Sequence, residues 1–147
     1  MKNKLLNQND LLKDLIAIIE QGKQQAVTQV NSRMTLVFWQ VGKRINEDVL
    51  QKERAKYGKQ VIEGLSKELV VKYGRSFQVR NIRRMIQFAT VFQDWRIVSP
   101  LATQLSWTHF VIVLSLKSQA ARLFYATKAA EARWGKRELT RRPKTNG

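Results

Sequence analysis

Residues 59–93 read KQVIEGLSKELVVKYGRSFQVRNIRRMIQFATVFQ, and this stretch contains two helix-forming segments joined by a short turn. Apolar residues recur every three to four positions in the first segment, which predicts a helix over Lys59–Tyr73. Gly74 suits the left-handed conformation in which many helices end. We expect Ser76 to cap a second helix over Phe77–Gln93. Two helices joined by a turn of this length match the spacing of a helix-turn-helix unit, at about 59–93.

The second helix has an apolar side and a polar side. The apolar side has the spacing of a buried helix face and consists of Ile82, Met85, Ile86, Ala89 and Phe92. The polar side carries side chains that suit base edges in the major groove, where Arg matches guanine and Asn or Gln matches adenine. The predicted nucleic-acid contacts on this segment are Gln78, Arg80, Asn81, Arg83, Arg84 and Gln87. The competing interpretation is an ordinary solvated helix face, and the net charge of the chain favours nucleic acid.

Further residues are candidates for holding phosphates. A helix N-terminus favours a phosphate, which makes the predicted capping serine a candidate. Basic residues on the first helix, at the turn and near the C-terminus could grip the backbone of a nucleic acid, or could serve solubility alone. These additional candidates are Ser76, Lys59, Lys67, Lys72, Arg75, Arg137 and Arg141.

The segments before this unit are predicted to be helical as well. Only two Pro and seven Gly occur in 147 residues, so helix breakers are few. The apolar spacing predicts a first helix that begins near Asn9 or Asp10 and a second that ends at about Lys52, with a break at Asn31-Ser32. These first 50 residues are nearly neutral, with 7 basic and 5 acidic groups.

The segments after the unit combine a non-helical region with further helices. Residues 96–105 contain Pro100 and β-favouring residues, so we expect a loop or a short β wing there. Ser106 and Ser118 are predicted to cap helices over 107–116 and 119–133, and a basic segment follows Gly135. The fold class is therefore mainly α. It is a helical bundle with a helix-turn-helix or winged-helix-like unit, one domain over 1–142 with a polar end at 143–147.

The charge of the chain indicates a polyanionic partner. Lys and Arg number 27 against 11 Asp and Glu, which gives a formal net charge of +16. Duplex DNA is the expected partner. RNA is an alternative, although the aromatic residues fall mostly at core positions and form no visible platform on which bases could stack. No apolar run is long enough to span a membrane and the N-terminus does not resemble a signal peptide, so we expect a cytoplasmic protein.

Catalysis by this chain is not expected. It has no Cys and a single His, His109, which excludes thiolate chemistry and a His-based zinc site, and one His with scattered acidic residues makes no credible Ser-His-Asp set. No Gly-rich phosphate loop is present, so the sequence predicts neither a metal nor a cofactor. A second interpretation comes from another class of function: the apolar N-terminal helices could form a homodimer seam or dock a nuclease partner, and binding to nucleic acid would then be non-specific.

Several motifs in order resemble the N-terminal domain of the YhcG-type PD-(D/E)XK nuclease family. The resemblance covers about residues 8–142 and rests on FWQVGKRI at 38–45, YGK at 57–59, RNIRRM at 80–85, LSWTH at 105–109 and REL at 137–139. It implies a bacterial helical domain of helix-turn-helix or winged-helix type that binds DNA. In full-length relatives this domain precedes a nuclease domain. The residues that would cut DNA are absent from this sequence, which is compatible with a piece of a longer protein and with a member that has only the binding module.

Overall fold

The computed structural model describes residues 2–25, 30–51 and 55–145, and within these ranges the secondary structure is helical. The prediction of a mainly α fold is therefore confirmed. The elements are α1 (Lys2–Gln25), α2 (Val30–Gln51), α3 (Ala55–Tyr73), the short 3-10 helix η1 (Arg75–Phe77), α4 (Val79–Val91), α5 (Trp95–Gln104), α6 (Trp107–Leu114), α7 (Gln119–Ala132) and α8 (Lys136–Thr145).

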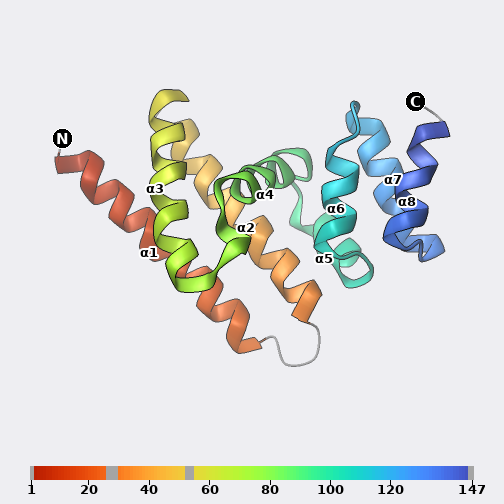
Figure 1. The fold of residues 1–147 in the computed structure, drawn as a ribbon, viewed down its shortest axis with the longest axis horizontal. Helices are drawn as coiled ribbons and strands as arrows, with labels where there is room; N and C mark the ends of the chain where they lie inside the picture. The colour runs from red at the N-terminus through yellow and green to blue at the C-terminus, as the bar shows by residue number, and fades with distance from the viewer. Residues whose placement is uncertain (1, 26–29, 52–54, 146–147) are drawn as a thin grey trace.

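Two hydrophobic clusters make up the core, and α4 contributes to both. Ile82 and Met85 of α4 lie in a cluster with the buried faces of α1, α2 and α3. Phe88 and Ala89, further along α4, lie in a second cluster with α5, α6, α7 and α8. Figure 1 shows α4 in the middle of the molecule, with α1 and α3 toward one end and α7 and α8 toward the other. The helix that carries the predicted nucleic-acid contacts is therefore the link between the two halves of the core.

The backbones of α2 and α4 touch at Gly42. A Cβ atom at this position would lie 2.0 Å from the carbonyl oxygen of Met85 and 2.9 Å from the nitrogen of Ile86, so only glycine fits. Close to this crossing, the indole N–H of Trp39 donates to the carbonyl of Phe92 at 2.6 Å. These contacts fix the position of α4 along its whole length.

Polar contacts hold α1 against its neighbours. The hydroxyl of Tyr73, at the end of α3, donates to the carboxylate of Glu20 at 2.5 Å. Burial, followed by the hydrogen bond and the negative charge of Glu20, raises the pKa of Tyr73 to about 12. Arg44 of α2 pairs with Asp14 of α1 at 2.9 Å. The neutral phenol and the ion pair therefore attach α1 to α3 and to α2.

The expected loop or β wing at 96–105 is wrong, because α5 occupies this region. Asp94 caps the helix by accepting a hydrogen bond from the backbone N–H of Arg96 at 2.9 Å. Val98, Ala102 and Leu105 are buried at helical spacing, which is the signal that outweighs the β-favouring residues. Pro100 lies on the exposed side of α5, where it removes one backbone hydrogen bond without ending the helix.

The helix ends around α4 are partly as predicted. Gly74 directly follows α3 and has a positive φ of 94°, so the prediction that it ends this helix is confirmed, but its ψ of −162° is not that of the left-handed helical conformation. Ser76 is not a cap, because η1 intervenes and the N-cap of α4 is Gln78, which makes no side-chain capping bond. The hydroxyl of Ser66 instead donates to the carbonyl of Phe77 at 2.7 Å and holds the turn against α3.

The other predicted helix ends give a similar result. Ser106 and Ser118 cap α6 and α7 as expected, although α6 ends at Leu114. The break at Asn31-Ser32 is wrong, because α2 begins at Val30. At the end of α7 the left-handed residue is Arg133, with φ 54°, rather than Gly135. The α8 helix extends through residue 145 and so includes part of the segment expected to be a polar end.

Among the described residues, no helix combines the length and the apolar character that crossing a membrane requires.

Substitution of Gly42 should destabilise the whole fold. We expect Gly42→Ala to lower the free energy of unfolding toward the upper end of the range of about 1–3 kcal/mol for overpacked sites, because the added methyl meets backbone atoms of α4. The measurement is chemical denaturation followed by circular dichroism. The matched control is Gly22→Ala, whose methyl would meet the Cγ2 atom of Val37, a side-chain atom that can move. An equal loss in both variants would contradict a backbone contact at Gly42.

Candidate nucleic-acid interface

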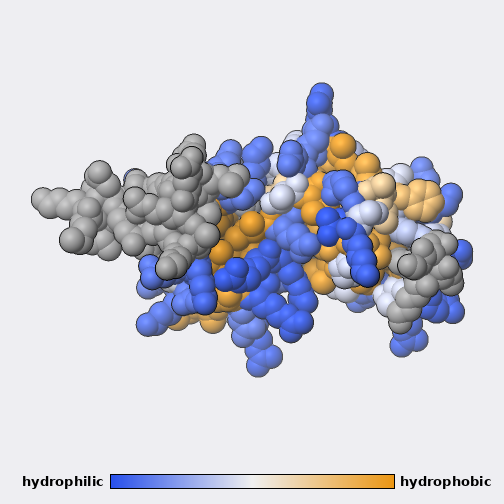
Figure 2. Space-filling view, turned by 90° about the horizontal axis from the view of Figure 1, so that it is seen from above, coloured by the Kyte–Doolittle hydropathy of each residue, from blue (hydrophilic) through white to orange (hydrophobic). Residues whose placement is uncertain are grey.

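The outer side of α4 carries three arginines within five residues. Arg80 and Arg83 are exposed and Arg84 is half-buried, while Ile82 and Met85 on the opposite side are fully buried. The helix lies between α2 on one side and α6 on the other (Figure 1). Hydrophilic side chains also gather over the middle of the molecule on the face that Figure 2 shows. We refer to Arg80, Arg83 and Arg84 as the arginine face of α4.

No carboxylate of the described residues pairs with the arginine face, and α4 itself contains no Asp or Glu. Arginines elsewhere on the surface do have such partners. Arg96 pairs with Asp94 at 3.2 Å, and Arg141 pairs with Glu138 at 2.5 Å. The hydrogen bonds from Arg142 and then Arg141 hold the pKa of Glu138 below its usual range. The arginine face is therefore a concentration of positive charge without local neutralisation.

Asn81 makes hydrogen bonds within the protein through both polar atoms of its amide. Its Oδ1 accepts from the indole N–H of Trp107 at 3.0 Å, and its Nδ2 donates to the carbonyl of Ser76 at 2.7 Å. These bonds join the start of α4 to the start of α6 and to η1. No local signal indicates this role, because Trp107 lies 26 positions further along the chain.

Gln87 also contacts the protein. Its Nε2 donates to the carbonyl of Leu114, the last residue of α6, at 3.2 Å. An unpaired carbonyl at a helix C-terminus is a strong acceptor, so this bond stabilises the end of α6. Asn81 and Gln87 are thus engaged with α6, whereas Gln78 at the N-cap makes no side-chain capping bond and the three arginines have no carboxylate partner among the described residues.

The residues that precede α4 are exposed. The side chains of Arg75, Ser76 and Gln78 face solvent at the start of the helix. The backbone of Ser76 accepts the hydrogen bond from Asn81, which leaves its hydroxyl on the surface. Arg75 and Gln78 therefore lie beside the N-terminal end of the arginine face.

The remaining predicted contacts are spread over other surfaces. Lys59, Lys67 and Lys72 are exposed on α3, but they lie roughly 80° to 140° apart around the helix axis, so they do not form a single face. Arg137 and Arg141 are exposed on α8, which Figure 1 places on the far side of α6 from α4. The structure therefore brings together the predicted residues of η1 and α4 and leaves those of α3 and α8 apart.

His109 has a structural role. The backbone N–H of Ser106 donates to its Nδ1 at 3.1 Å, so Nε2 carries the hydrogen and donates to the carbonyl of Trp134 at 2.8 Å. The imidazole thereby completes the capping box of α6 and joins it to the connection between α7 and α8. His109 is therefore a half-buried, hydrogen-bonded residue of the fold.

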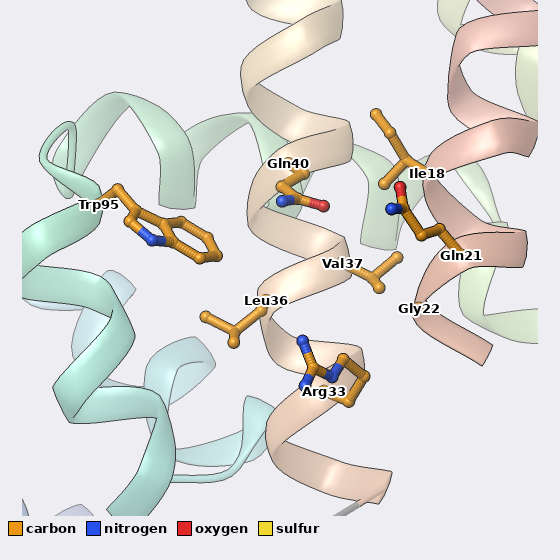
Figure 3. A pocket seen from close by; sticks show the side chains of 8 residues that line it. All are labelled: Ile18, Gln21, Gly22, Arg33, Leu36, Val37, Gln40 and Trp95. Carbon is orange, nitrogen blue, oxygen red and sulfur yellow. The ribbon is translucent and has the colours of Figure 1, made fainter. Parts of the chain in front are cut away.

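The pockets do not resemble a catalytic site. One pocket of about 140 Å³ lies between α1, α2 and α5, where Arg33, Gln21, Gln40 and Trp95 surround it (Figure 3). This volume is below the range of about 300–1,000 Å³ that small-molecule sites have. A more open hollow of about 340 Å³ between α5 and α7 has one carboxylate, that of Glu131. Within the described ranges, no three His, Asp or Glu side chains lie close enough to hold a metal ion.

Comparison with known protein families identifies the domain. The model of the DUF1016 N-terminal domain matches residues 14–146, which include α2, α3, η1 and α4 in full. This chain belongs to the DUF1016 N-terminal domain family. The resemblance predicted from the sequence motifs is thereby confirmed, and it extends over nearly the whole chain.

A longer protein is similar to this chain. The chain is 29% identical over 157 aligned residues to a protein named Putative nuclease YhcG from Escherichia coli (strain K12). The match covers 86% of this chain but 42% of that relative, so the chain spans less than half of the relative's length. No solved structure matches the chain.

Replacement of Asn81 should cost stability, because it joins α4 to α6. We expect Asn81→Ala to lower the free energy of unfolding by about 1–3 kcal/mol, since the indole N–H of Trp107 loses its acceptor. Asn81→Asp keeps an acceptor oxygen and should lose less. Urea denaturation of both variants measures the effect. Unchanged stability in Asn81→Ala, together with weaker binding to DNA, would contradict the structural role and indicate a direct contact with a base.

Proposed function

We propose that this DUF1016 N-terminal domain binds duplex DNA, with α3, η1 and α4 acting as a helix-turn-helix unit and α4 as its recognition helix. The observation that carries the proposal is the arginine face of α4, which has no carboxylate partner among the described residues. A helix-turn-helix unit inserts its second helix into the major groove. The exposed residues of η1, among them Arg75, would lie against the adjacent phosphates.

The energetics of the arginine face support a polyanionic partner. Like charges three and four positions apart on a helix repel each other by about 0.2–0.5 kcal/mol per pair. Arg80, Arg83 and Arg84 include such pairs, and no acidic residue of α4 offsets them. Phosphates would remove this repulsion. The opposite side of the helix is anchored by Gly42 and the two hydrophobic clusters, so the face would meet DNA without rearrangement of the core.

Two further facts support the same proposal. The net charge of +16 would attract nucleic acid from a distance and strengthen contacts with phosphates. The longer relative bears the name of a nuclease, an enzyme class that acts on nucleic acid, and this domain matches less than half of its length. A DNA-binding role for the domain and a catalytic role for the remainder of such a protein are consistent with that division.

A second candidate function is the docking of a protein partner. Ile97 on α5 and Leu123 and Phe124 on α7 are large apolar side chains that are 42%, 39% and 56% exposed. The apolar residues of α1 and α2 that suggested a dimer seam, such as Leu15 and Val41, are buried inside the chain instead. Docking would therefore use the C-terminal half of the domain, on α5 and α7, and leave α4 free.

Binding of labelled DNA tests the proposed function. We expect Arg83→Ala and Arg84→Ala each to weaken duplex binding by about 1–3 kcal/mol where the arginine contacts a base, and to make the salt dependence shallower by roughly one unit where it contacts a phosphate. Fluorescence anisotropy at about 50 and 200 mM salt measures both effects. Competition with single-stranded DNA and RNA establishes the preference for a duplex.

The control for these variants is Arg96→Ala, which removes the same charge from α5. It should bind nearly as tightly as the unmodified protein. Equal losses for Arg96→Ala and the two α4 variants would contradict a role for α4 as the recognition helix. Equal binding to duplex, single strand and RNA that disappears at the higher salt would leave only non-specific electrostatic attraction.

A further inference from the structure

We propose that the arginine face of α4 recognises guanine, in neighbouring base pairs of a duplex. This inference rests on the proposed function and goes beyond it, because it names the base that the site prefers. Of the four bases, guanine is the one that the available side chains on the exposed side of α4 match best.

Adenine is matched by Asn or Gln, whose amide N–H donates to N7 while the amide oxygen accepts from the N6 amino group. On α4 these residues are Asn81 and Gln87. Both polar atoms of the Asn81 amide have partners, Trp107 at 3.0 Å and Ser76 at 2.7 Å, and the Gln87 amide donates to Leu114 at 3.2 Å. Turning either side chain toward a base would break the bonds that join α4 to α6. Within α4 (Val79–Val91) no adenine-matching side chain is free, and Gln78, exposed at the N-cap, is the one such group beside the N-terminal end of the helix.

Cytosine and thymine are matched no better. Cytosine N4 donates to Asp or Glu, and α4 contains neither residue. Thymine offers a methyl group and one acceptor, which Thr can contact, and the only Thr of α4 is Thr90. Its hydroxyl donates to the carbonyl of Ile86 at 2.8 Å and accepts from Asn46 at 3.2 Å, and it lies at the C-terminal end of the helix. Recognition helices contact base edges through their N-terminal residues, so Thr90 is poorly placed.

Guanine remains, and the arginine face suits it. The planar guanidinium group donates two parallel hydrogen bonds to the O6 and N7 atoms of guanine, the commonest specific contact in the major groove. Arg80, Arg83 and Arg84 lie in the N-terminal half of α4, and no carboxylate of the described chain competes for them.

The spacing of the arginines sets the spacing of the bases. Arg80 and Arg84 are one turn apart, which is a rise of about 6 Å along the helix axis. Base pairs follow each other at about 3.4 Å, so this rise spans roughly two steps of the duplex. The three arginines therefore fit guanines in two or three consecutive base pairs.

The alternative use of the same arginines is to hold phosphates, which carries no sequence information. The two uses differ in their dependence on the fork-shaped guanidinium group. A lysine keeps the positive charge and attracts phosphates, but its ammonium group lacks the planar fork that donates two parallel bonds to O6 and N7, so it matches guanine less specifically. Arg83→Lys and Arg84→Lys therefore separate recognition of a base from attraction to the backbone.

The experiment compares three duplexes that have the same length and flanks. One has a central run of G·C pairs with the guanines on one strand, one has A·T pairs there, and the third has 7-deazaguanine, which lacks the N7 acceptor. At about 200 mM salt we expect the G·C duplex to bind about 5-fold more tightly than the A·T duplex or better, and the 7-deazaguanine duplex to lose most of this advantage. Arg83→Lys and Arg84→Lys should retain binding to the A·T duplex and show a reduced preference for guanine.

The outcomes distinguish DNA binding by α4 from recognition of guanine by its arginines. If Arg83→Ala and Arg84→Ala bind every duplex as well as the unmodified protein, the proposed function fails and the inference falls with it. If these variants weaken binding to all three duplexes equally and the unmodified protein shows no preference, the DNA-binding role stands and recognition of guanine is overturned. Tighter binding to the A·T duplex, or a preference for guanine that is undiminished in both lysine variants, would also overturn it.

Discussion

The contact of two helix backbones at Gly42 is the constraint on which the rest of the structure depends. Because the position has no side chain, α2 approaches the carbonyl of Met85 closely and fixes α4 in the centre of the molecule. The buried side of α4 then supplies Ile82 and Met85 to one hydrophobic cluster and Phe88 to the other. Since a helix has two sides, this arrangement also determines which residues face outward, and these include Arg80 and Arg83.

Hydrogen bonds from α4 to α6 reduce the number of side chains on the outward side of α4 that are available to bind a ligand. Asn81 and Gln87 hold Trp107 and the end of α6, so two residues that could contact DNA have structural roles instead. The groups that remain are guanidinium groups with no carboxylate partner among the described residues. Rigid attachment on both flanks would keep the backbone that carries these side chains in place before a ligand arrives, which lowers the entropic cost of binding. Structural and functional roles are thus divided between side chains of the same short helix.

Local sequence signals predicted much of the fold. The helices around Gly74 followed from apolar spacing and the glycine at the turn, and Ser106 and Ser118 marked the starts of α6 and α7. Predictions failed where two local signals conflicted. For residues 96–105 the prediction gave more weight to Pro100 than to the helical spacing of the buried residues. The structure instead forms the helix α5, which Asp94 caps.

The candidate site could be predicted only in part. Apolar and polar spacing along residues 79–91 identified the exposed side of α4 and its arginines. The role of Asn81 could not be predicted, because it depends on a tryptophan 26 positions away, and the close approach at Gly42 depends on Met85 of another helix. Contacts between distant segments are not encoded in local periodicity, so the sequence could not separate residues free to bind from those already engaged.

The most direct test of the account is an NMR titration of the labelled domain with duplex DNA. Arginine side-chain and backbone amide signals report which face meets the ligand, and the Asn81 side-chain amide and the Trp107 indole N–H report on the contact between α4 and α6. If the arginine face of α4 binds the duplex, we expect the signals of Arg80, Arg83 and Arg84 to change first and most. The signals of Asn81 and Trp107 should keep the chemical shifts of their hydrogen-bonded state. Changes concentrated on α8, or on α5 and α7, with the arginines of α4 unaffected, would contradict it.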